Sequence, residues 1–556
     1  MQASFLSGAA ALSLIAAPAG AALPKDFAAK ADKLVAKSWA ADGPGAAVIV
    51  TDHGKIVYQS ERGLADIEAK TPIGPDTVFR LGSITKQFSS SVLLQLVAEG
   101  KLSLDDKLSK FYPGYPEPGG SATVRQLLNH TSGIMSYTSI PGWMVEANTN
   151  KPYTTDQLIS VFRDMPVTFK PGEKWDYNNS GYILIGGIIE KVTGKPWPEA
   201  VAERIAAPLH LSTLEYGVGE DKVAKMAKGY SETEPGKFQP STKIHMSVPG
   251  AAGALIASAP DLAAWGNALH HGKVVPPALY SAMTTPAKLN DGKTEAYGFG
   301  LRMGEIRGHR TVEHGGGIFG FTTASFYLPD QDLFVAVLVN SGPPVISPDF
   351  VAKKLAALAI GDPYPQFAKR PIDMKAVEPF LGAYAVEGSD QPRIFFAEKG
   401  KLFTRRADGR PLEVYSAGAN RFFYGDDVFD WFELKNAGGN KVMEMHPEGG
   451  PKAERAVRAG PVPQAEKPVD VPVEVLKTYV GSYKVGPAAA VVTLTEGGLV
   501  VKLGDQPTLK LIPRGTNEFE VESAGARLVF NSTNGSPASS MSIKQEGRSM
   551  DAPRIP

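Results

Sequence analysis

Apolar and polar positions follow different periods in different parts of this chain of 556 residues. Residues 27–39 have the spacing of an amphipathic helix, and residues 46–58 alternate around a turn at 52–55, which predicts a β-hairpin. A second hairpin is predicted at 325–339, and the pattern between the two hairpins is mostly helical. Strands at both ends with helices between them predict an α+β domain with one antiparallel sheet that both ends complete.

After residue 361 the helical period gives way to short alternating runs separated by Gly, Asn and Asp. The residues of this region form an internal repeat. Leu412, Gly418, Asn420 and Phe422 recur 97 positions later as Leu509, Gly515, Asn517 and Phe519. The segment 380–384 likewise has a counterpart at 479–483. This repetition predicts two duplicated small antiparallel β-barrel modules, joined by the proline-rich stretch 460–472.

These patterns predict four parts: a signal peptide at 1–22, the α+β domain at 23–362, and β-barrel modules at 374–460 and 473–556. The signal peptide rests on the apolar run 5–17 and the small residues 19–22, although no Lys or Arg precedes the run. The alternative is a frayed, alanine-rich tail. A signal peptide implies a periplasmic or secreted protein. No other segment is long and apolar enough to predict a transmembrane span.

The composition excludes several classes of partner and of chemistry. Lys+Arg and Asp+Glu both total 58, so a zero net charge gives no reason to expect nucleic acid or an anionic membrane as partner. The absence of cysteine excludes disulfides, thiolate metal sites and cysteine nucleophiles. Adjacent His270 and His271 point apart on a helix and lack a carboxylate cluster, so we expect a solvated helix end there. We predict no metal and no cofactor.

Ser83 and Lys86 stand three residues apart where a helical pattern begins. Residues at i and i+3 lie on one helix face, with Cβ atoms roughly 5–6 Å apart. Serine needs a neighbouring base to act as a nucleophile, and burial lowers the pKa of a lysine amine. The pair is therefore a candidate nucleophile and base. The alternative is a helix-capping serine beside a solvated lysine.

Two further motifs follow. Tyr177 and Asn179 lie on a predicted loop before a helix, spaced so that both can face one pocket, or they are turn residues. His314 begins a run of glycines beside a predicted strand, which indicates close approach to the backbone or a flexible loop. His130 ends a predicted helix, where a structural role in bonding the backbone is favoured over a catalytic one.

Ser83-x-x-Lys86, Tyr177-x-Asn179 and His314-Gly315-Gly316, in this order, resemble the motifs of the penicillin-recognising serine hydrolases. That family comprises class C β-lactamases, D-Ala-D-Ala carboxypeptidases, related esterases and D-aminopeptidases. The resemblance covers residues 25–360 and extends to the segments 130–133, 253–255, 260–262 and 297–301. It implies a β-lactamase-like domain, with an antiparallel sheet flanked by helices and an all-α subdomain around 100–240.

The resemblance also implies roles. Ser83 becomes acylated, and Lys86 and Tyr177 carry protons, with a lysine cation lowering the pKa of the tyrosine from about 10. Asn179 holds Lys86 and the substrate amide. Backbone N–H groups of Ser83 and Gly317 form the oxyanion hole, and Gly316 belongs to the same substrate-binding strand.

One position departs from most of the family, which has lysine where this chain has His314. A histidine with a reference pKa of about 6.5 is mostly neutral at pH 7, which weakens the case for anionic substrates. The two β modules make the chain most similar to three-domain D-aminopeptidases. The alternatives are a β-lactamase, carboxypeptidase or esterase of the same family, or a penicillin-binding sensor that does not turn over. The partner expected is a small-molecule or peptide substrate, and the oligomeric state stays open.

Overall fold

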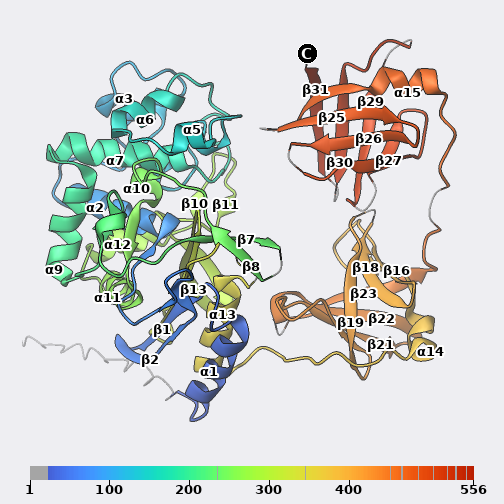
Figure 1. Ribbon diagram of the computed structural model, residues 1–556, viewed down its shortest axis with the longest axis horizontal. Helices are drawn as coiled ribbons and strands as arrows, with labels where there is room; N and C mark the ends of the chain where they lie inside the picture. Colours follow the sequence, from blue (N-terminus) through green and yellow to red (C-terminus); the bar gives the residue numbers. More distant parts are fainter. Residues whose placement is uncertain are drawn as a thin grey trace, which may run out of the picture.

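The computed structural model describes residues 23–555 apart from short gaps at 235, 343, 345, 408, 451, 465–466, 486–487, 505, 522–523, 533–534 and 546–547. The predicted signal peptide lies outside the described residues, so the periplasmic or secreted location stays a prediction. Figure 1 shows an N-terminal domain of helices around a sheet, with two β-barrels beside it. Within the described residues, no helix combines the length and hydropathy needed to cross a membrane.

The N-terminal domain is built on an antiparallel sheet with the strand order β12-β13-β14-β15-β1-β2. The two predicted hairpins meet at its centre, where β1 pairs with β15 and Val48 lies opposite Val337. The prediction of a sheet completed by both ends of the domain is confirmed. The strands are β1 (Ala46–Asp52), β2 (Lys55–Arg62), β12 (Arg302–Ile306), β13 (His309–Ile318), β14 (Phe321–Leu328) and β15 (Leu333–Val339).

Alternation along the central strands gives the sheet two buried faces. Val48 and Val50 of β1 belong to a core shared with α1 (Phe27–Ser38) and α13 (Pro348–Ala359). Ala47 and Ile49 point the other way, into the core that holds α2 (Thr85–Ala98) and α11 (Ala259–His270). Successive side chains of a strand face opposite sides, so one strand serves both cores.

The region between β2 and β12 is mainly helical, but the subdomain around 100–240, expected to be all-α, also contains the short strands Glu215–Tyr216, Tyr230–Glu234 and Lys237–Pro240. Its other helices are α3 (Leu108–Phe111), α4 (Val124–Leu128), α5 (Glu146–Thr149), α6 (Thr155–Phe162), α7 (Asn179–Thr193), α8 (Trp197–Val201), α9 (Ala207–Leu209), α10 (Gly250–Gly253) and α12 (Pro277–Met283). Its short strands are β3 (Leu64–Asp66), β4 (Thr71–Pro72), β5 (Phe79–Arg80), β6 (Glu215–Tyr216), β7 (Tyr230–Glu234), β8 (Lys237–Pro240), β9 (Leu255–Ala257), β10 (Ala287–Lys288) and β11 (Thr294–Glu295).

Both predicted modules are closed antiparallel barrels, seen in orange and red in Figure 1. The first barrel follows α14 (Met374–Val377) and consists of β16 (Gly382–Val386), β17 (Arg393–Glu398), β18 (Lys401–Arg406), β19 (Leu412–Gly418), β20 (Arg421–Phe423), β21 (Trp431–Ala437), β22 (Asn440–His446) and β23 (Glu454–Gly460). The second follows α15 (Val473–Tyr479) and consists of β24 (Gly481–Val485), β25 (Ala488–Thr495), β26 (Gly498–Leu503), β27 (Leu509–Pro513), β28 (Glu518–Val521), β29 (Ala526–Asn531), β30 (Ser540–Gln545) and β31 (Arg548–Ile555). The exact domain boundaries stay predictions.

The repeated segment closes each barrel in the same way. Tyr384 donates its hydroxyl to the Phe380 carbonyl at 2.5 Å, and Tyr483 donates to the Tyr479 carbonyl at 2.8 Å. Both tyrosine rings are fully buried. The sequence repeat therefore marks an equivalent structural corner, in which a buried hydroxyl finds a partner in the turn that precedes the first strand.

The first barrel packs against the N-terminal domain through the segment that follows α13. Tyr364 of this segment stacks on Phe429 of the barrel with ring centroids 4.0 Å apart. Arg307 binds Asp362 at 2.9 Å and also donates to the Gly449 carbonyl of the barrel. The link between the two units therefore combines an aromatic stack with a hydrogen-bonded arginine.

Candidate active site

Ser83 lies in a 3-10 turn, Gly82–Ile84, that runs directly into α2. One turn separates it from Lys86, and the Lys86 Nζ atom lies 3.0 Å from the Ser83 Oγ atom. Almost every residue of α2 is buried, and Phe88 stacks on Trp265 with centroids 4.0 Å apart. The buried helix fixes the pair in place, so the contact expected from the i, i+3 spacing is present.

Lys86 is fully buried and has three hydrogen-bond partners. Besides Ser83, its amine lies 2.9 Å from Asn179 Oδ1 and 2.8 Å from the Ala252 carbonyl oxygen. Asn179 turns its Nδ2 group to Thr138 at 3.2 Å, which leaves Oδ1 for the lysine. Burial lowers the pKa of Lys86 well below its ordinary value. A neutral amine donates two N–H groups to the two carbonyl oxygens and keeps its lone pair for the Ser83 hydroxyl.

Tyr177 lies at the end of the loop before α7, with its ring centroid 4.8 Å from Lys86 Nζ. Burial raises the pKa of Tyr177, and a hydrogen bond with Ser83 offsets part of this rise. The sequence-based expectation that a lysine cation lowers this pKa is wrong, because burial favours the neutral form of both groups. Tyr177 is therefore a phenol, a proton donor in the resting site.

His130 holds the backbone on both sides of Tyr177. Its carbonyl oxygen accepts the Asp176 N–H at 3.0 Å, and its Nδ1 atom accepts the Asn178 N–H at 3.1 Å. The ring is buried, and burial lowers the pKa of His130 well below its ordinary value. These contacts give His130 a role in positioning the loop, which is the role that the sequence favoured.

Two glycines let β13 approach the serine turn closely. A Cβ atom on Gly316 would collide with the Leu81 carbonyl oxygen, and one on Gly82 would lie 2.9 Å from the Gly317 nitrogen. Gly82 also has φ of +53°, a conformation that favours glycine. The glycine run is thus a site of close backbone approach rather than a flexible loop, and it brings Gly317 beside the residue that precedes Ser83.

His314 of β13 is buried and uses both ring nitrogens within the protein. Its Nδ1 atom lies 2.6 Å from the Gly315 carbonyl oxygen, and its Nε2 atom lies 2.9 Å from the Tyr297 hydroxyl. A carbonyl only accepts, so Nδ1 carries the hydrogen and Nε2 accepts from Tyr297. Burial lowers the pKa of His314 to about 3. The ring is neutral, as the sequence indicated, but its titration falls well below pH 6.

A cavity of about 400 Å³ opens beside Ser83. Ser83, Tyr177, His314 and Gly315 line it together with three charged residues: Arg302, Glu313 and Asp349. The sequence analysis missed all three. Glu313 immediately precedes His314 and could have been noticed there, whereas Asp349 begins α13 and carries no local sign of its place in the cavity.

The charged residues of this cavity come from two strands and one helix. Arg302 of β12 is the cross-strand partner of Glu313, and its guanidinium carbon lies 5.7 Å from the Tyr297 ring centroid. Burial raises the pKa of both Glu313 and Asp349. Two carboxyl groups and one guanidinium therefore line the cavity at Ser83, while His314, with a pKa of about 3, is neutral at pH 7.

A family model described as Beta-lactamase matches residues 31–359, more than half of the chain. The chain belongs to this family. It is a serine hydrolase, and its Ser83, Lys86 and Tyr177 lie within the matched residues.

Curated relatives and solved structures agree with the family. A penicillin-binding protein of Bacillus subtilis (strain 168) is 27% identical over 399 residues, which cover 68% of this chain and 87% of the relative. A D-aminopeptidase of Brucella canis is 30% identical over 300 residues, 54% of this chain. That match spans only 56% of the D-aminopeptidase's own length.

Among solved structures, an octameric penicillin-binding protein homologue from Pyrococcus abyssi has a TM-score of 0.56 at 25% identity, covering 77% of this chain and 99% of its own. The D-amino acid amidase from Ochrobactrum anthropi SV3, complexed with L-phenylalanine amide, has a TM-score of 0.52 at 27% identity, covering 60% of this chain and 97% of its own. The likeness of the second structure covers about as much of this chain as the family model does.

Proposed function

We propose that this hydrolase cleaves small amides or peptides whose acyl group carries a free α-amino group, and that D-aminoacyl compounds are its best substrates. The observation that carries the proposal is the presence of Glu313 and Asp349 in the same cavity as Ser83. The D-aminopeptidase and D-amino acid amidase relatives support both the substrate class and its stereochemistry.

The acylation step follows from the hydrogen bonds at Ser83. Its hydroxyl oxygen attacks the substrate carbonyl carbon while its proton passes to the lone pair of Lys86, 3.0 Å away. Backbone N–H groups of Ser83 and Gly317 stabilise the oxyanion, and losing one such donor typically costs about 10²–10³ in rate. The close approach of β13 to the serine turn supports this pairing of donors.

Tyr177 completes the proton transfers. Its phenol gives a proton to the leaving nitrogen, the C–N bond breaks, and the proton held by Lys86 restores the phenol. An ester of Ser83 remains. In the second half of the reaction a water molecule attacks this ester, gives up its proton through the same groups, and releases the carboxylic acid.

The cavity charges select the acyl group. A substrate ammonium beside Glu313 and Asp349 neutralises carboxylates that burial has partly deprived of water, and hydrogen bonds to charged groups contribute about 1.5–3 kcal/mol each. In their neutral forms, Lys86 and His314 do not repel the substrate ammonium. An acetylated amine has no charge to offer these two carboxylates.

Arg302 favours one alternative. Its exposed guanidinium lines the same cavity and can bind a substrate carboxylate, as a carboxypeptidase or β-lactamase requires. The penicillin-binding relative supports this second function. Since one guanidinium faces two carboxyl groups, the aminoacyl substrate is the better electrostatic match.

A chromogenic panel tests the proposal: D-alanine p-nitroanilide, its L-enantiomer, its N-acetyl derivative and a cephalosporin. We expect the D-aminoacyl anilide to have the highest kcat/KM, and acetylation to lower it about 10- to 150-fold, the equivalent of 1.5–3 kcal/mol. Faster turnover of the cephalosporin would indicate the β-lactamase function. Stoichiometric acylation without turnover would indicate a sensor.

Matched variants test whether Glu313 and Asp349 bind the free amine of the substrate. Glu313→Gln and Asp349→Asn should each reduce the preference for the free amine over its acetylated form. Glu305→Gln removes an exposed carboxylate from neighbouring β12 and should leave the preference unchanged. An unchanged preference in both cavity variants contradicts the assignment of the amine site, even if Ser83 remains the nucleophile.

A further inference from the structure

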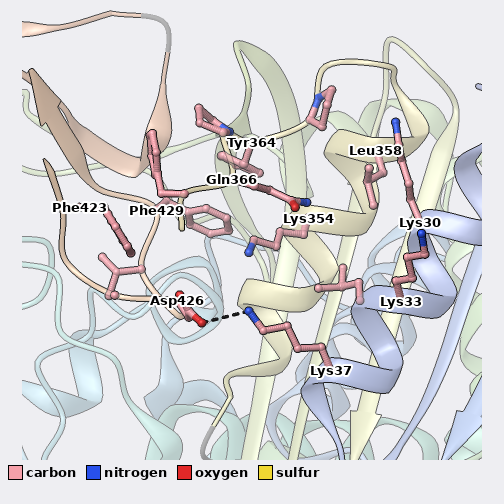
Figure 2. A pocket seen from close by; sticks show the side chains of 16 residues that line it. Lys30, Lys33, Lys37, Lys354, Leu358, Tyr364, Gln366, Phe423, Asp426 and Phe429 are labelled. Atoms are coloured by element: carbon pink, nitrogen blue, oxygen red, sulfur yellow. Dashed lines mark hydrogen bonds and ion pairs between the residues drawn. The ribbon is translucent and has the colours of Figure 1, made fainter. Parts of the chain in front are cut away.

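A second cavity, of about 530 Å³, lies where the N-terminal domain meets the first barrel. Figure 2 shows it between α1 and α13 on one side and the barrel segment 423–429 on the other. None of the residues that line it also lines the cavity at Ser83. Its volume falls within the roughly 300–1,000 Å³ usual for small-molecule sites.

Four lysines face this cavity, and two of them have ionic partners. Lys30 pairs with Asp26 at 2.7 Å, and Lys37 reaches across the cavity to Asp426 of the barrel at 3.0 Å, the dashed line in Figure 2. Among the described residues, no carboxylate forms an ion pair with the other two, which are Lys33 of α1 and Lys354 of α13.

The pKa of Lys354 responds to the positive charge around it. Burial lowers the pKa of Lys354, and the charge of Lys37 lowers it further, while Asp426 and Asp427 oppose the shift. Its ammonium lies 4.2 Å from the Phe350 ring centroid, a contact that compensates only part of the lost hydration. An anion in the cavity would relieve this repulsion.

Four aromatic rings line another part of the wall. Tyr364 stacks on Phe429 with centroids 4.0 Å apart, and Phe367 stacks on Phe423 at 5.4 Å. In Figure 2, Lys354 extends from α13 towards the Phe429 ring, so charge and aromatic surface meet in one space. A fully hydrated inorganic anion would leave the aromatic wall unused.

We propose that this cavity binds an amphiphilic organic anion, whose carboxylate or phosphate head lies beside the Lys354 ammonium and whose aromatic or alkyl body packs on the aromatic rings of the wall. The ligand contacts α1 and α13 of the N-terminal domain and β-strand connections of the first barrel, so its binding stabilises the docking of the two units.

Isothermal titration calorimetry on the full chain tests this with a matched pair, 4-phenylbutanoate and 4-phenylbutan-1-ol. We expect one equivalent of the acid to bind and the alcohol to bind at least tenfold more weakly, because only the acid has a charge for the lysines. Phenyl phosphate, titrated separately, shows whether a phosphate head binds better than a carboxylate. Inorganic phosphate alone should bind at least tenfold more weakly than either aromatic anion.

The double variant Lys33→Gln/Lys354→Gln should bind the acid at least tenfold more weakly. Lys55→Gln, which removes an exposed lysine on β2, should leave the affinity for the acid unchanged. Fluorophosphonate labelling of Ser83 and the thermal melting curve verify that each variant is folded. If the double variant does not fold, Lys354→Gln alone removes the ammonium beside Phe350 and should still weaken binding. No heat with the acid, equal affinity for the alcohol, or unchanged affinity in the folded variants would overturn the proposal.

Discussion

The lowered pKa of Lys86 has a consequence for stability that Lys86→Met would reveal. Methionine retains most of the length of the side chain and has no group to titrate. In the wild type, burial lowers the pKa of Lys86 in the folded state, whereas the unfolded chain keeps a value of about 10.4. The folded state thus binds fewer protons than the unfolded state at every pH between these two values.

The sign and size of this change in the free energy of unfolding follow from proton linkage. Because the unfolded state binds more protons in this window, the free energy of unfolding contributed by Lys86 rises with pH, by up to about 1.4 kcal/mol per unit. At each pH between the two pKa values of Lys86, the free energy of unfolding of the wild type should therefore rise with pH relative to that of Lys86→Met. Other groups titrate alike in both proteins and cancel in the difference. The variant should also lose about 10²–10⁴ in kcat, the usual contribution of a general base.

Urea unfolding at several pH values, followed by tryptophan fluorescence, measures this difference. Five of the six tryptophans lie in the N-terminal domain, so the signal reports the unit that holds Lys86. Lys55→Met, at an exposed lysine, is the matched control and should show no slope relative to wild type. Parallel curves for wild type and Lys86→Met would refute a neutral Lys86 and with it the role of the amine as the ready base.

Four further outcomes test the site. A fluorophosphonate should add one mass adduct to the wild type and none to Ser83→Ala. Tyr177→Phe should lose most of kcat, yet its double variant with Lys86→Met should be little worse than the poorer single variant, because both groups serve one proton transfer. Gly316→Ala should lower the free energy of unfolding by about 1–3 kcal/mol, because its Cβ collides with the Leu81 carbonyl, whereas a Cβ on Gly317 meets open space and should cost far less. His314 should cause no inflection of kcat/KM between pH 6 and 7, since its pKa of about 3 leaves it neutral throughout that range.

The sequence predicted those parts of the fold that depend on local periodicity. Alternation located both hairpins, and the repeat with an offset of 97 located both barrels. Fixed helical spacing likewise predicted the contact between Ser83 and Lys86. Patterns of this kind succeed because the period of a strand or helix determines which neighbours share a face.

Interpretations that required knowledge of tertiary surroundings failed. His270 was expected at a solvated helix end, but its ring stacks on Tyr327 at 4.1 Å, and burial lowers its pKa to about 3. The expected lowering of the Tyr177 pKa by Lys86 failed for the same reason, because burial raises that pKa. Whether a titratable group carries a charge depends on how many distant segments exclude water from it, and the sequence near the group does not contain that information.

The same argument moves substrate selection away from His314. At the level of sequence, replacing the family's lysine with histidine looks like the loss of a positive charge from the cleft. In the fold, the imidazole is neutral and occupied by Gly315 and Tyr297, so it offers a substrate no free nitrogen. The charged residues that line the cavity are Arg302, Glu313 and Asp349, and in the proposed function the two carboxylates bind a substrate ammonium. Under the proposed function, the neutral histidine does not repel a free-amine substrate, and the neighbouring carboxylates would supply the attraction.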